Sequence, residues 1–188
     1  MGEPRQVDPV LLVVAVFTRH DAAFRWAHER LETCYGPIGM ASPAYSFHQT
    51  TYYQDTMGPD LRKQFLAFRD LVPQDNLAPT KLNTNALEQE VVRGALYPEP
   101  RPLNLDPGHL SLGKFLLATT KDQAHRIYLR DGTFAEVTLR YEAGAFVPWP
   151  WTYADYREPA LLGFLNEARD FYRERLRAQR RAAEEAGS

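Results

Sequence analysis

Eight consecutive apolar residues, Val10–Phe17, constrain the fold of this chain more than any other segment. They read VLLVVAVF, and half of them are valine. A strand buried on both faces gives such an unbroken run, whereas a half-exposed strand alternates apolar with polar residues. We therefore expect Val10–Phe17 to form a central strand that is covered on both faces.

Two further segments carry apolar residues at helical spacing. After the predicted strand, Phe24, Ala27, Leu31 and Cys34 recur every three or four residues, and a Gly-Pro pair then supplies a stop signal. Near the end of the chain, Pro159–Arg177 opens with a proline in its first turn and keeps one apolar face. We expect a helix in each segment.

The middle of the chain combines strand and helix signals. Lys63–Arg69 allows either element, and we favour a strand; Thr80–Arg93 indicates a helix with the apolar stripe Leu82, Leu87 and Val91. The segment LNLDPGHL predicts a short strand followed by an Asp-Pro-Gly turn. The segment SLGKFLLATT allows a helix or a strand, and we favour the helix.

These elements together predict an α+β fold, in which helices pack on a mostly antiparallel sheet. A chain of 188 residues is long enough to bury one core. We therefore expect a single domain over residues 1–188, with flexible ends at residues 1–8 and 180–188.

Composition narrows the class of protein. The net charge of −2 offers no broad basic field, so we expect no nucleic-acid partner. An apolar run of eight residues is too short to span a bilayer, so we expect no membrane association. The single cysteine, Cys34, cannot form an internal disulfide, which is typical of a cytoplasmic protein. The sequence leaves the cofactor unknown, and the spacing of a paired-histidine or EF-hand metal site is absent.

The dipeptide Asp131-Gly132 is the strongest hairpin signal in the chain, because both residues tolerate the positive φ of a tight turn. A hairpin centred there pairs Leu129 with Phe134, Ile127 with Glu136, and His125 with Thr138. One face of this hairpin then carries His125, Ile127, Leu129, Phe134, Glu136, Thr138 and Arg140. A one-residue shift in register would move these side chains to the other face.

His125 and Glu136 are the candidate catalytic residues. In the predicted register they are diagonal neighbours, roughly 7–8 Å apart at the backbone, within reach of long side chains. A carboxylate beside an imidazole orients it and favours its protonated form, which suits a general acid, a general base or an anion holder. The alternative is a polar, solvated hairpin edge.

Basic and hydroxyl residues around the hairpin are the candidate ligand-binding residues. Lysine and arginine side chains hold phosphate or carboxylate through charge-assisted hydrogen bonds, although such residues near strand ends are often simply solvated. The aromatic segment that follows, with Trp149 and Trp151, suits stacking on a base or sugar or, as we favour for the tryptophans, a strap across the core. The candidates are Lys114, Thr119, Lys121, Arg126, Thr138, Tyr153 and Arg157.

The chain also resembles a known family, most specifically at TKDQAHRIYL, FAEVTL and PWPWTYADYR. Further matching segments are VLLVVAVF, GPI, MGPDLRKQFLAF and KLNTNALE. The family is bacterial and is catalogued as a domain of unknown function, and some of its members are labelled GTP-binding proteins. This resemblance implies a shared fold and a shared site. The chain departs from the family pattern at Thr56, where an acidic residue is usual, and at His48, where aspartate is common.

The sequence contains no motif that would support the GTP-binding label, because it has no glycine-rich phosphate-binding loop. Our leading hypothesis is an enzyme or binder for a small anionic or phosphorylated ligand. His125 and Glu136 would transfer or orient a proton, and Lys114, Lys121 and Arg126 would hold the anion. The alternatives are a protein-interaction module without chemistry and a nucleotide-binding protein without a phosphate loop. Nothing in the sequence sets the oligomeric state.

Overall fold

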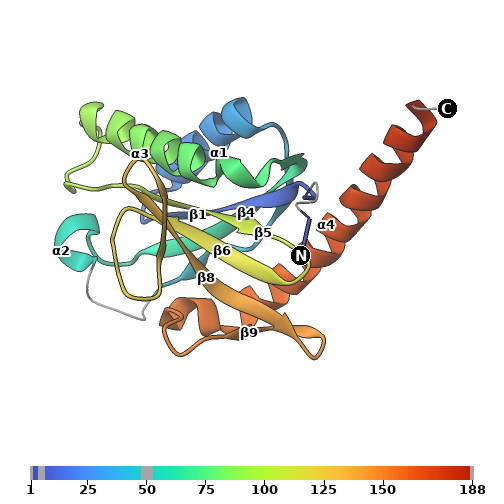
Figure 1. Cartoon of the computed structure of the whole chain (residues 1–188). Coiled ribbons are helices and arrows are strands. Elements are labelled where there is room, and N and C mark those ends of the chain that lie inside the picture. The colour runs from blue at the N-terminus through green and yellow to red at the C-terminus, as the bar shows by residue number, and fades with distance from the viewer. Residues whose placement is uncertain (1, 4–6, 48–52, 187–188) are drawn as a thin grey trace.

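The computed structural model describes residues 2–3, 7–47 and 53–186. Nine strands in these residues form one antiparallel sheet with the order β2-β4-β1-β5-β6-β8-β7; β3 adds to β4, and β9 adds to β8 (Figure 1). The strands are β1 (Val10–Thr18), β2 (Ile38–Ala41), β3 (Tyr45–Ser46), β4 (Arg62–Val72), β5 (Asn104–Leu110), β6 (Lys114–Thr119), β7 (Ile127–Arg130), β8 (Thr133–Glu142) and β9 (Ala145–Pro148).

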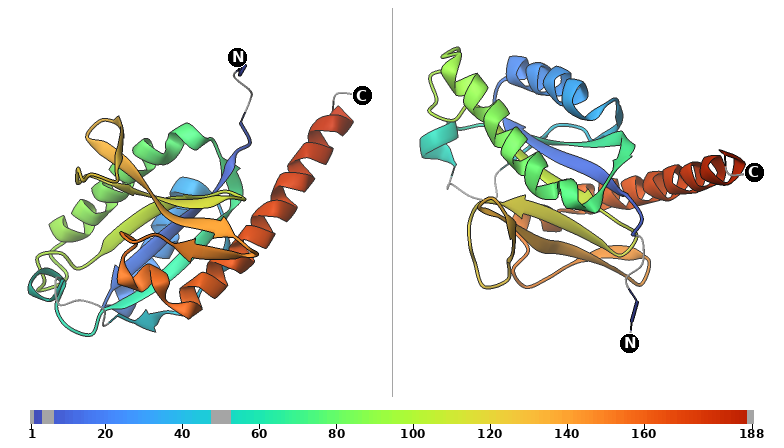
Figure 2. Two further views of the ribbon diagram at one scale, coloured as in Figure 1. Left: turned by 60° about the horizontal axis from the view of Figure 1, so that its bottom comes forward. Right: turned by 45° about the horizontal axis from the view of Figure 1, so that its top comes forward.

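Helices cover both faces of the sheet, which confirms the predicted α+β class. The helices are α1 (Asp21–Tyr35), α2 (Gln54–Met57), α3 (Leu77–Arg93) and α4 (Pro159–Ala186), with short 3₁₀ turns η1 (Gln74–Asn76) and η2 (Ala154–Arg157). Helices α1 and α3 lie together on one face, and α4 crosses the opposite face (Figures 1 and 2).

Strand β1 is the central, doubly covered strand that the sequence predicts, and all nine of its residues are buried. Alternate side chains of β1 point to opposite faces of the sheet and pack in two separate hydrophobic cores. Leu12, Val14 and Val16 pack with α1 and α3. Leu11 and Val13 pack with α4. The unbroken apolar run is therefore explained by burial on both sides.

The first 110 residues follow a recognisable chain path. Strands β1 and β2 run parallel and are joined by α1, and β4 lies between them in the sheet. In the same way, β4 and β5 run parallel and are joined by α3, and β1 lies between them. Two such split βαβ units are the connectivity of ferredoxin-like folds. Strands β6 to β9 and helix α4 extend this unit.

The predicted helices exist, with some differences in their faces and ends. Leu87 and Val91 of α3 are buried, but Leu82 is 41% exposed, and Cys34 of α1 is also exposed. Helix α4 continues to Ala186, beyond the predicted end at Arg177. The added turns follow from helix-forming residues, not from the apolar stripe. The mobility of residues 1–8 and 180–188 stays a prediction.

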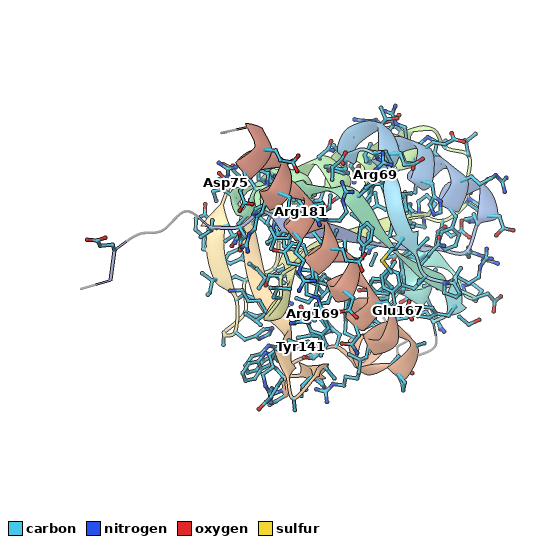
Figure 3. All side chains as sticks on the ribbon, turned by 90° about the vertical axis from the view of Figure 1, so that its right-hand side faces the viewer. Arg69, Asp75, Tyr141, Glu167, Arg169 and Arg181 are labelled. Carbon is cyan, nitrogen blue, oxygen red and sulfur yellow. The ribbon has the colours of Figure 1, made fainter. Side chains whose placement is uncertain are left out.

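Helix α4 is attached to the sheet by polar contacts as well as by its apolar face. The Arg169 guanidinium lies 3.6 Å from the ring centre of Tyr141 and donates to the carbonyl of Leu112 (Figure 3). Farther along, Arg180 pairs with Asp8 at 2.7 Å. None of the helices in the described residues is both apolar and long enough to cross a membrane.

The segment LNLDPGHL forms the predicted strand but not the predicted turn, and SLGKFLLATT takes the strand alternative, not the favoured helix. Asp106, Pro107 and Gly108 lie inside strand β5, and SLGKFLLATT contains strand β6 instead of a helix. Strand β5 pairs with β1 along its whole length, but with β6 only over Gly108–Leu110. The two strands therefore diverge, and Asn104–Pro107 keeps one sheet neighbour.

This divergence explains the proline and the glycine. Pro107 lacks an N–H, which a strand tolerates where no neighbour requires that donor. At Gly108 an added Cβ would collide with the carbonyl of Leu116 and the ring of Phe115. The glycine is needed because β6 crosses close to β5 at this point. The turn chemistry that these residues suggested is overridden by the pairing with β1.

The hairpin turn is predicted correctly, but its register is wrong. Asp131 and Gly132 have φ of 51° and 68° and connect the pair Arg130 and Thr133. An irregularity between Tyr128 and Arg130 then shifts the pairing, so that Tyr128 opposes Phe134 and Ile127 opposes Ala135. A bulge of this kind adds one unpaired residue and moves all later pairs. His125 and Arg126 precede β7 and belong to a turn.

His109 is a buried histidine on β5 and is 2% exposed. Its Nε2 has no hydrogen-bond partner among the described residues. Burial lowers the pKa of His109 to about 4, although the Asp75 carboxylate partly opposes this effect. The folded protein therefore holds His109 neutral at pH 7.

This lowered pKa predicts a loss of stability in acid. A histidine with a folded pKa of about 4 and an ordinary pKa of 6.5 stabilises the fold above pH 6.5. That contribution is lost as the pH falls through 4, and it amounts to about 3 kcal/mol. Urea unfolding should show the wild type losing about 3 kcal/mol relative to His109→Leu between pH 7 and pH 4. Parallel pH profiles for the two proteins would contradict a buried neutral histidine.

Candidate functional site

A cavity of about 660 Å³ occupies the space where β5 and β6 diverge. Its walls come from α3, from the first residues of β4 and β5, from the end of β6, and from the segments before β7 and around η2. Small-molecule sites usually measure 300–1,000 Å³, so the cavity suits a small organic ligand. In the described part of the chain, the charged residues that line it are Lys63, Lys81, Arg101, Asp106, Lys121, Arg126, Glu136 and Asp155.

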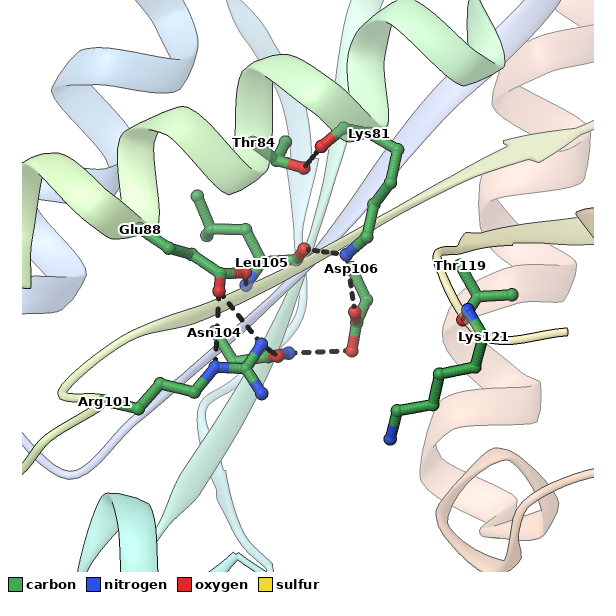
Figure 4. Close-up of polar contacts among 9 residues, drawn as sticks. All are labelled: Lys81, Thr84, Glu88, Arg101, Asn104, Leu105, Asp106, Thr119 and Lys121. Atoms are coloured by element: carbon green, nitrogen blue, oxygen red, sulfur yellow. Dashed lines mark hydrogen bonds and ion pairs between the residues drawn. The ribbon is translucent and has the colours of Figure 1, made fainter. Parts of the chain in front are cut away.

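Side chains of α3 bond the edge of β5 that β6 leaves open. Glu88 accepts a hydrogen bond from the backbone N–H of Leu105 at 2.7 Å. Lys81 donates to the carbonyl of the same residue at 3.0 Å (Figure 4). Residues seven apart share a helix face, so both side chains reach the same strand edge. Two charged side chains thus replace the hydrogen bonds of a neighbouring strand.

A polar chain continues from these residues along β5 (Figure 4). Arg101 donates to Glu88 at 2.9 Å and also bonds Asn104. Asn104 donates to Asp106 at 2.7 Å, and Lys81 donates to the other oxygen of Asp106 at 3.2 Å. Each of these residues contacts the next, so the chain is continuous across the cavity wall.

Burial acts differently on the two carboxylates of this chain. For Glu88, burial raises the pKa and outweighs the opposing charges of Arg101 and Lys81. For Asp106, burial also raises the pKa, but the charges of Lys81 and Lys63, together with hydrogen bonds from Asn104 and Lys81, outweigh it, and the net pKa is lowered. Asp106 is therefore ionised at neutral pH. Its side chain is 32% exposed, and this exposed surface faces the cavity that Asp106 lines.

Lys63 is a buried cation in an aromatic surrounding. Its ammonium group pairs with Asp155. It also lies 4.2 Å from the ring centre of Tyr156 and 5.4 Å from that of Phe17. A cation over an aromatic face is attracted by the ring quadrupole, most strongly when water is excluded. This group forms the floor of the cavity on the α4 side of the sheet.

The wall opposite α3 is organised by Arg126. Its guanidinium donates to Glu136 at 2.9 Å, to the hydroxyl of Tyr153 at 2.7 Å, and to the carbonyl of Lys121 at 2.9 Å. The side chains of Arg126 and Glu136 are each 1% exposed. Glu136 also accepts from Thr138 at 3.2 Å. The side chain of Arg126 is thus held in one position by three partners.

His125 contacts Glu136 from outside the cavity. Its Nε2 lies 3.3 Å from the Glu136 carboxylate, so the predicted contact forms despite the changed register. The imidazole stacks on Trp151, with ring centres 5.6 Å apart, and Trp151 stacks on Trp149 at 5.1 Å. Among the described residues, those that line the cavity include Glu136 but not His125.

Comparison with known proteins identifies a family. The family model described as Domain of unknown function (DUF4416) matches residues 8–172. The chain belongs to the DUF4416 family. Searches of curated proteins and of solved structures give no match. The matched range of this DUF4416 protein contains all the charged residues of the cavity.

The predicted ligand-binding residues of the DUF4416 chain lie in different places. Thr119, Lys121, Arg126 and Tyr153 line the cavity. Lys114 begins β6, roughly 16 Å of strand from Thr119. It lines a separate cavity of about 120 Å³ beside His109 and Ser111.

Thr138 and Arg157 have structural partners. The Thr138 hydroxyl donates to Glu136, and its carbonyl accepts from Thr152 at 2.6 Å. Arg157 donates to three backbone carbonyls within residues 149–152 and so fixes that turn. His48 lies outside the described residues. Thr56 is exposed, and its carbonyl accepts from the backbone N–H of Arg101 at 2.9 Å.

The predicted site lacked five polar residues of this cavity, Lys63, Lys81, Arg101, Asn104 and Asp106. Two signals in the sequence point toward this wall. Lys63 alternates with Phe65 and Ala67 on one face of an apolar strand, where an exposed lysine is not expected. Lys81, Asn85 and Glu88 also share one helix face. In the described part of the chain, His, Cys, Asp and Glu side chains form no group of three that could hold a metal ion.

The burial of the Arg126–Glu136 pair changes the effect expected of a mutation. Glu136→Ala leaves a guanidinium that is 1% exposed without its carboxylate. Removing one partner of a buried pair typically costs about 3–5 kcal/mol. We expect Glu136→Ala to lose stability in this range in urea unfolding measurements.

Glu142→Ala is the matched control, because Glu142 lies on the same strand and pairs with Arg140. Its side chain is 58% exposed, so the loss should stay within about 1 kcal/mol. Equal effects in the two variants would contradict a stabilising role for the buried pair.

Proposed function

We propose that this cavity binds a small organic anion that carries a phosphate or carboxylate group. The main support is the balance of charge on its walls. Among the described residues, five cations line the cavity, Lys63, Lys81, Arg101, Lys121 and Arg126, against the three carboxylates of Asp106, Glu136 and Asp155. Glu88 adds a fourth carboxylate behind Arg101. The five cations exceed these four carboxylates by one charge, which a ligand with a negative charge would balance.

The anionic group is assigned to the wall that carries Lys121 and Arg126. Lys121 extends from the segment after β6 toward the side of the cavity where Asp106 lies (Figure 4). Arg126 is held by Glu136 and Tyr153, which makes Glu136 a positioning residue for a fixed guanidinium. The buried Arg126 side chain, 1% exposed, adds a fixed positive charge behind this wall, and Lys121 is the proposed direct contact of the anion.

The rest of the ligand is assigned to the aromatic end of the cavity. Phe17, Phe47, Tyr53 and Tyr156 line this end. Apolar and aromatic walls with a few convergent polar groups are typical of small-molecule sites. The proposed ligand is therefore an organic molecule with an anionic group, such as a phosphorylated metabolite. Catalysis by His125 and Glu136, a cytoplasmic location and a bacterial origin stay separate predictions.

Replacing Lys121 tests this proposal. In a calorimetric screen of phosphorylated and carboxylated metabolites, Lys121→Ala should weaken binding about tenfold or more, because a charge-assisted bond contributes about 1.5–3 kcal/mol. Lys114→Ala is the matched control. Lys114 is an exposed lysine at the start of β6, whereas Lys121 follows the end of β6, and Lys114 does not line this cavity. Lys114→Ala should bind as the wild type does.

Two outcomes would count against the proposal. Equal weakening in both variants would indicate a general surface charge effect, and no binding of any anion would remove the proposed site. The nucleotide alternative enters the same screen, because it requires binding of GTP without binding of simpler phosphates.

A second candidate function, protein interaction, rests on the surface of β7. Ile127, Tyr128 and Leu129 are consecutive on this edge strand and are 70%, 58% and 40% exposed. Exposed apolar clusters of this kind commonly mark protein contacts. The Tyr128 ring contacts Phe134 edge-on, with ring centres 5.4 Å apart.

Sedimentation velocity tests the interaction candidate. If two copies associate through β7, the wild type should sediment as a dimer that Ile127→Lys dissociates. Leu96→Lys changes an 80% exposed leucine elsewhere and should leave the dimer intact. A monomeric wild type, or a dimer that resists Ile127→Lys, would contradict association through β7.

A further inference from the structure

One carboxylate in the cavity differs from the others in its exposure. The side chain of Glu136 is 1% exposed, that of Glu88 is 8% exposed, and that of Asp155 is 10% exposed. Asp106 is 32% exposed and lines the cavity. The other three carboxylates are enclosed by their cation partners. Asp106 presents oxygen surface to whatever occupies the cavity.

Asp106 acts as a hydrogen-bond acceptor toward the cavity. Lys81 keeps it ionised through a contact of 3.2 Å, and the nearby charge of Lys63 acts in the same direction. An ionised carboxylate has about four acceptor positions and no donor. Lys81 takes one position and Asn104 takes another. The remaining positions face the cavity, where a donor group of the ligand can take the place of water.

The charges around Asp106 select the kind of donor. A phosphate oxygen next to Asp106 would meet a like charge, which disfavours the anionic group at this wall. A ligand ammonium would meet Lys81, whose own ammonium already lies against the same carboxylate. A neutral hydroxyl group avoids both repulsions. The amides of Asn85 and Asn104, which also line the cavity, suit hydroxyl groups equally well.

We infer that the cavity recognises a hydroxylated anion, a polyol phosphate or carboxylate, whose hydroxyl groups donate to Asp106 while its anionic group lies toward Lys121 and Arg126. This inference rests on the proposed function and adds a polarity to it. The wall with Lys121 and Arg126 attracts the negative charge of the ligand. The opposite wall, with Asp106, accepts hydrogen bonds from its hydroxyl groups. An anion without hydroxyl groups, or an analogue that lacks them, would interact only with the wall that carries Lys121 and Arg126.

Paired ligands test this polarity without any mutation. Isothermal titration calorimetry would compare glycerol 3-phosphate with propyl phosphate, and ribose 5-phosphate with 2-deoxyribose 5-phosphate. The hydroxylated member of at least one pair should bind about tenfold more tightly to the wild type, because its additional hydroxyl group donates a charge-assisted hydrogen bond to Asp106. 2-Hydroxyethyl phosphate should likewise bind more tightly than phosphoethanolamine.

Asp106→Asn links the preference to one residue. The substitution keeps the shape of the side chain, and Lys81 retains its bond to the carbonyl of Leu105. In this variant, binding of the hydroxylated phosphate should weaken about tenfold, while propyl phosphate should bind unchanged or more tightly. If Asp106→Asn does not fold, the comparison of paired ligands on the wild type decides alone.

The outcomes separate the two proposals. If all these phosphates bind, Lys121→Ala weakens them, and the members of each pair bind alike, the role of Asp106 is overturned and the anion site stands. If phosphoethanolamine binds more tightly than 2-hydroxyethyl phosphate, the donor is an ammonium and the inference is wrong. If no phosphate or carboxylate binds, both the proposed function and this inference fail.

Discussion

The architecture depends on how the open edge of β5 is satisfied. Strand β6 pairs with β5 over three residues and then leaves it, which exposes backbone groups inside the molecule. A buried N–H or carbonyl without a partner costs about as much as a lost hydrogen bond. Glu88 and Lys81 supply the partners from α3. The sheet can therefore open without losing its hydrogen bonding, and the opening becomes a cavity.

The same solution brings charge into the interior. Lys81, Glu88, Lys63 and Asp155 have side chains at most 10% exposed, and such pairs seldom stabilise a fold more than well-packed apolar residues would. Stability alone therefore does not account for so many charges around one cavity. Clusters of buried ionisable groups are more typical of functional sites than of structural cores.

Much of the fold could be predicted from local patterns. The apolar run at Val10–Phe17 requires cover on two faces, and the apolar stripe after Pro159 requires a helix, whatever the rest of the chain does. SLGKFLLATT and the Asp-Pro-Gly segment were mispredicted because strand pairing, which local sequence does not encode, decided their structure. The bulge beside Leu129 likewise has no local signal.

The site was only partly predictable for the same reason. Arg126, Glu136 and Lys121 lie near one another in the sequence around a recognisable turn, so the hairpin led to them. Lys63, Arg101 and Asn104 join the cavity through the sheet order, which brings β4 and β5 to either side of β1. No spacing rule links these positions. A lysine on the apolar face of β4 was the available clue.

The narrow pairing between β5 and β6 has a mechanical consequence. It is the seam between the split βαβ half of the molecule and the half built from β6 to β9, and three residue pairs bridge it in the sheet. The cavity opens at this seam, and its walls come from both halves. A bound ligand would contact both halves and hold them together. Because it binds only the folded protein, it would also raise the free energy of unfolding. Amide exchange along β5 and β6 would then slow together.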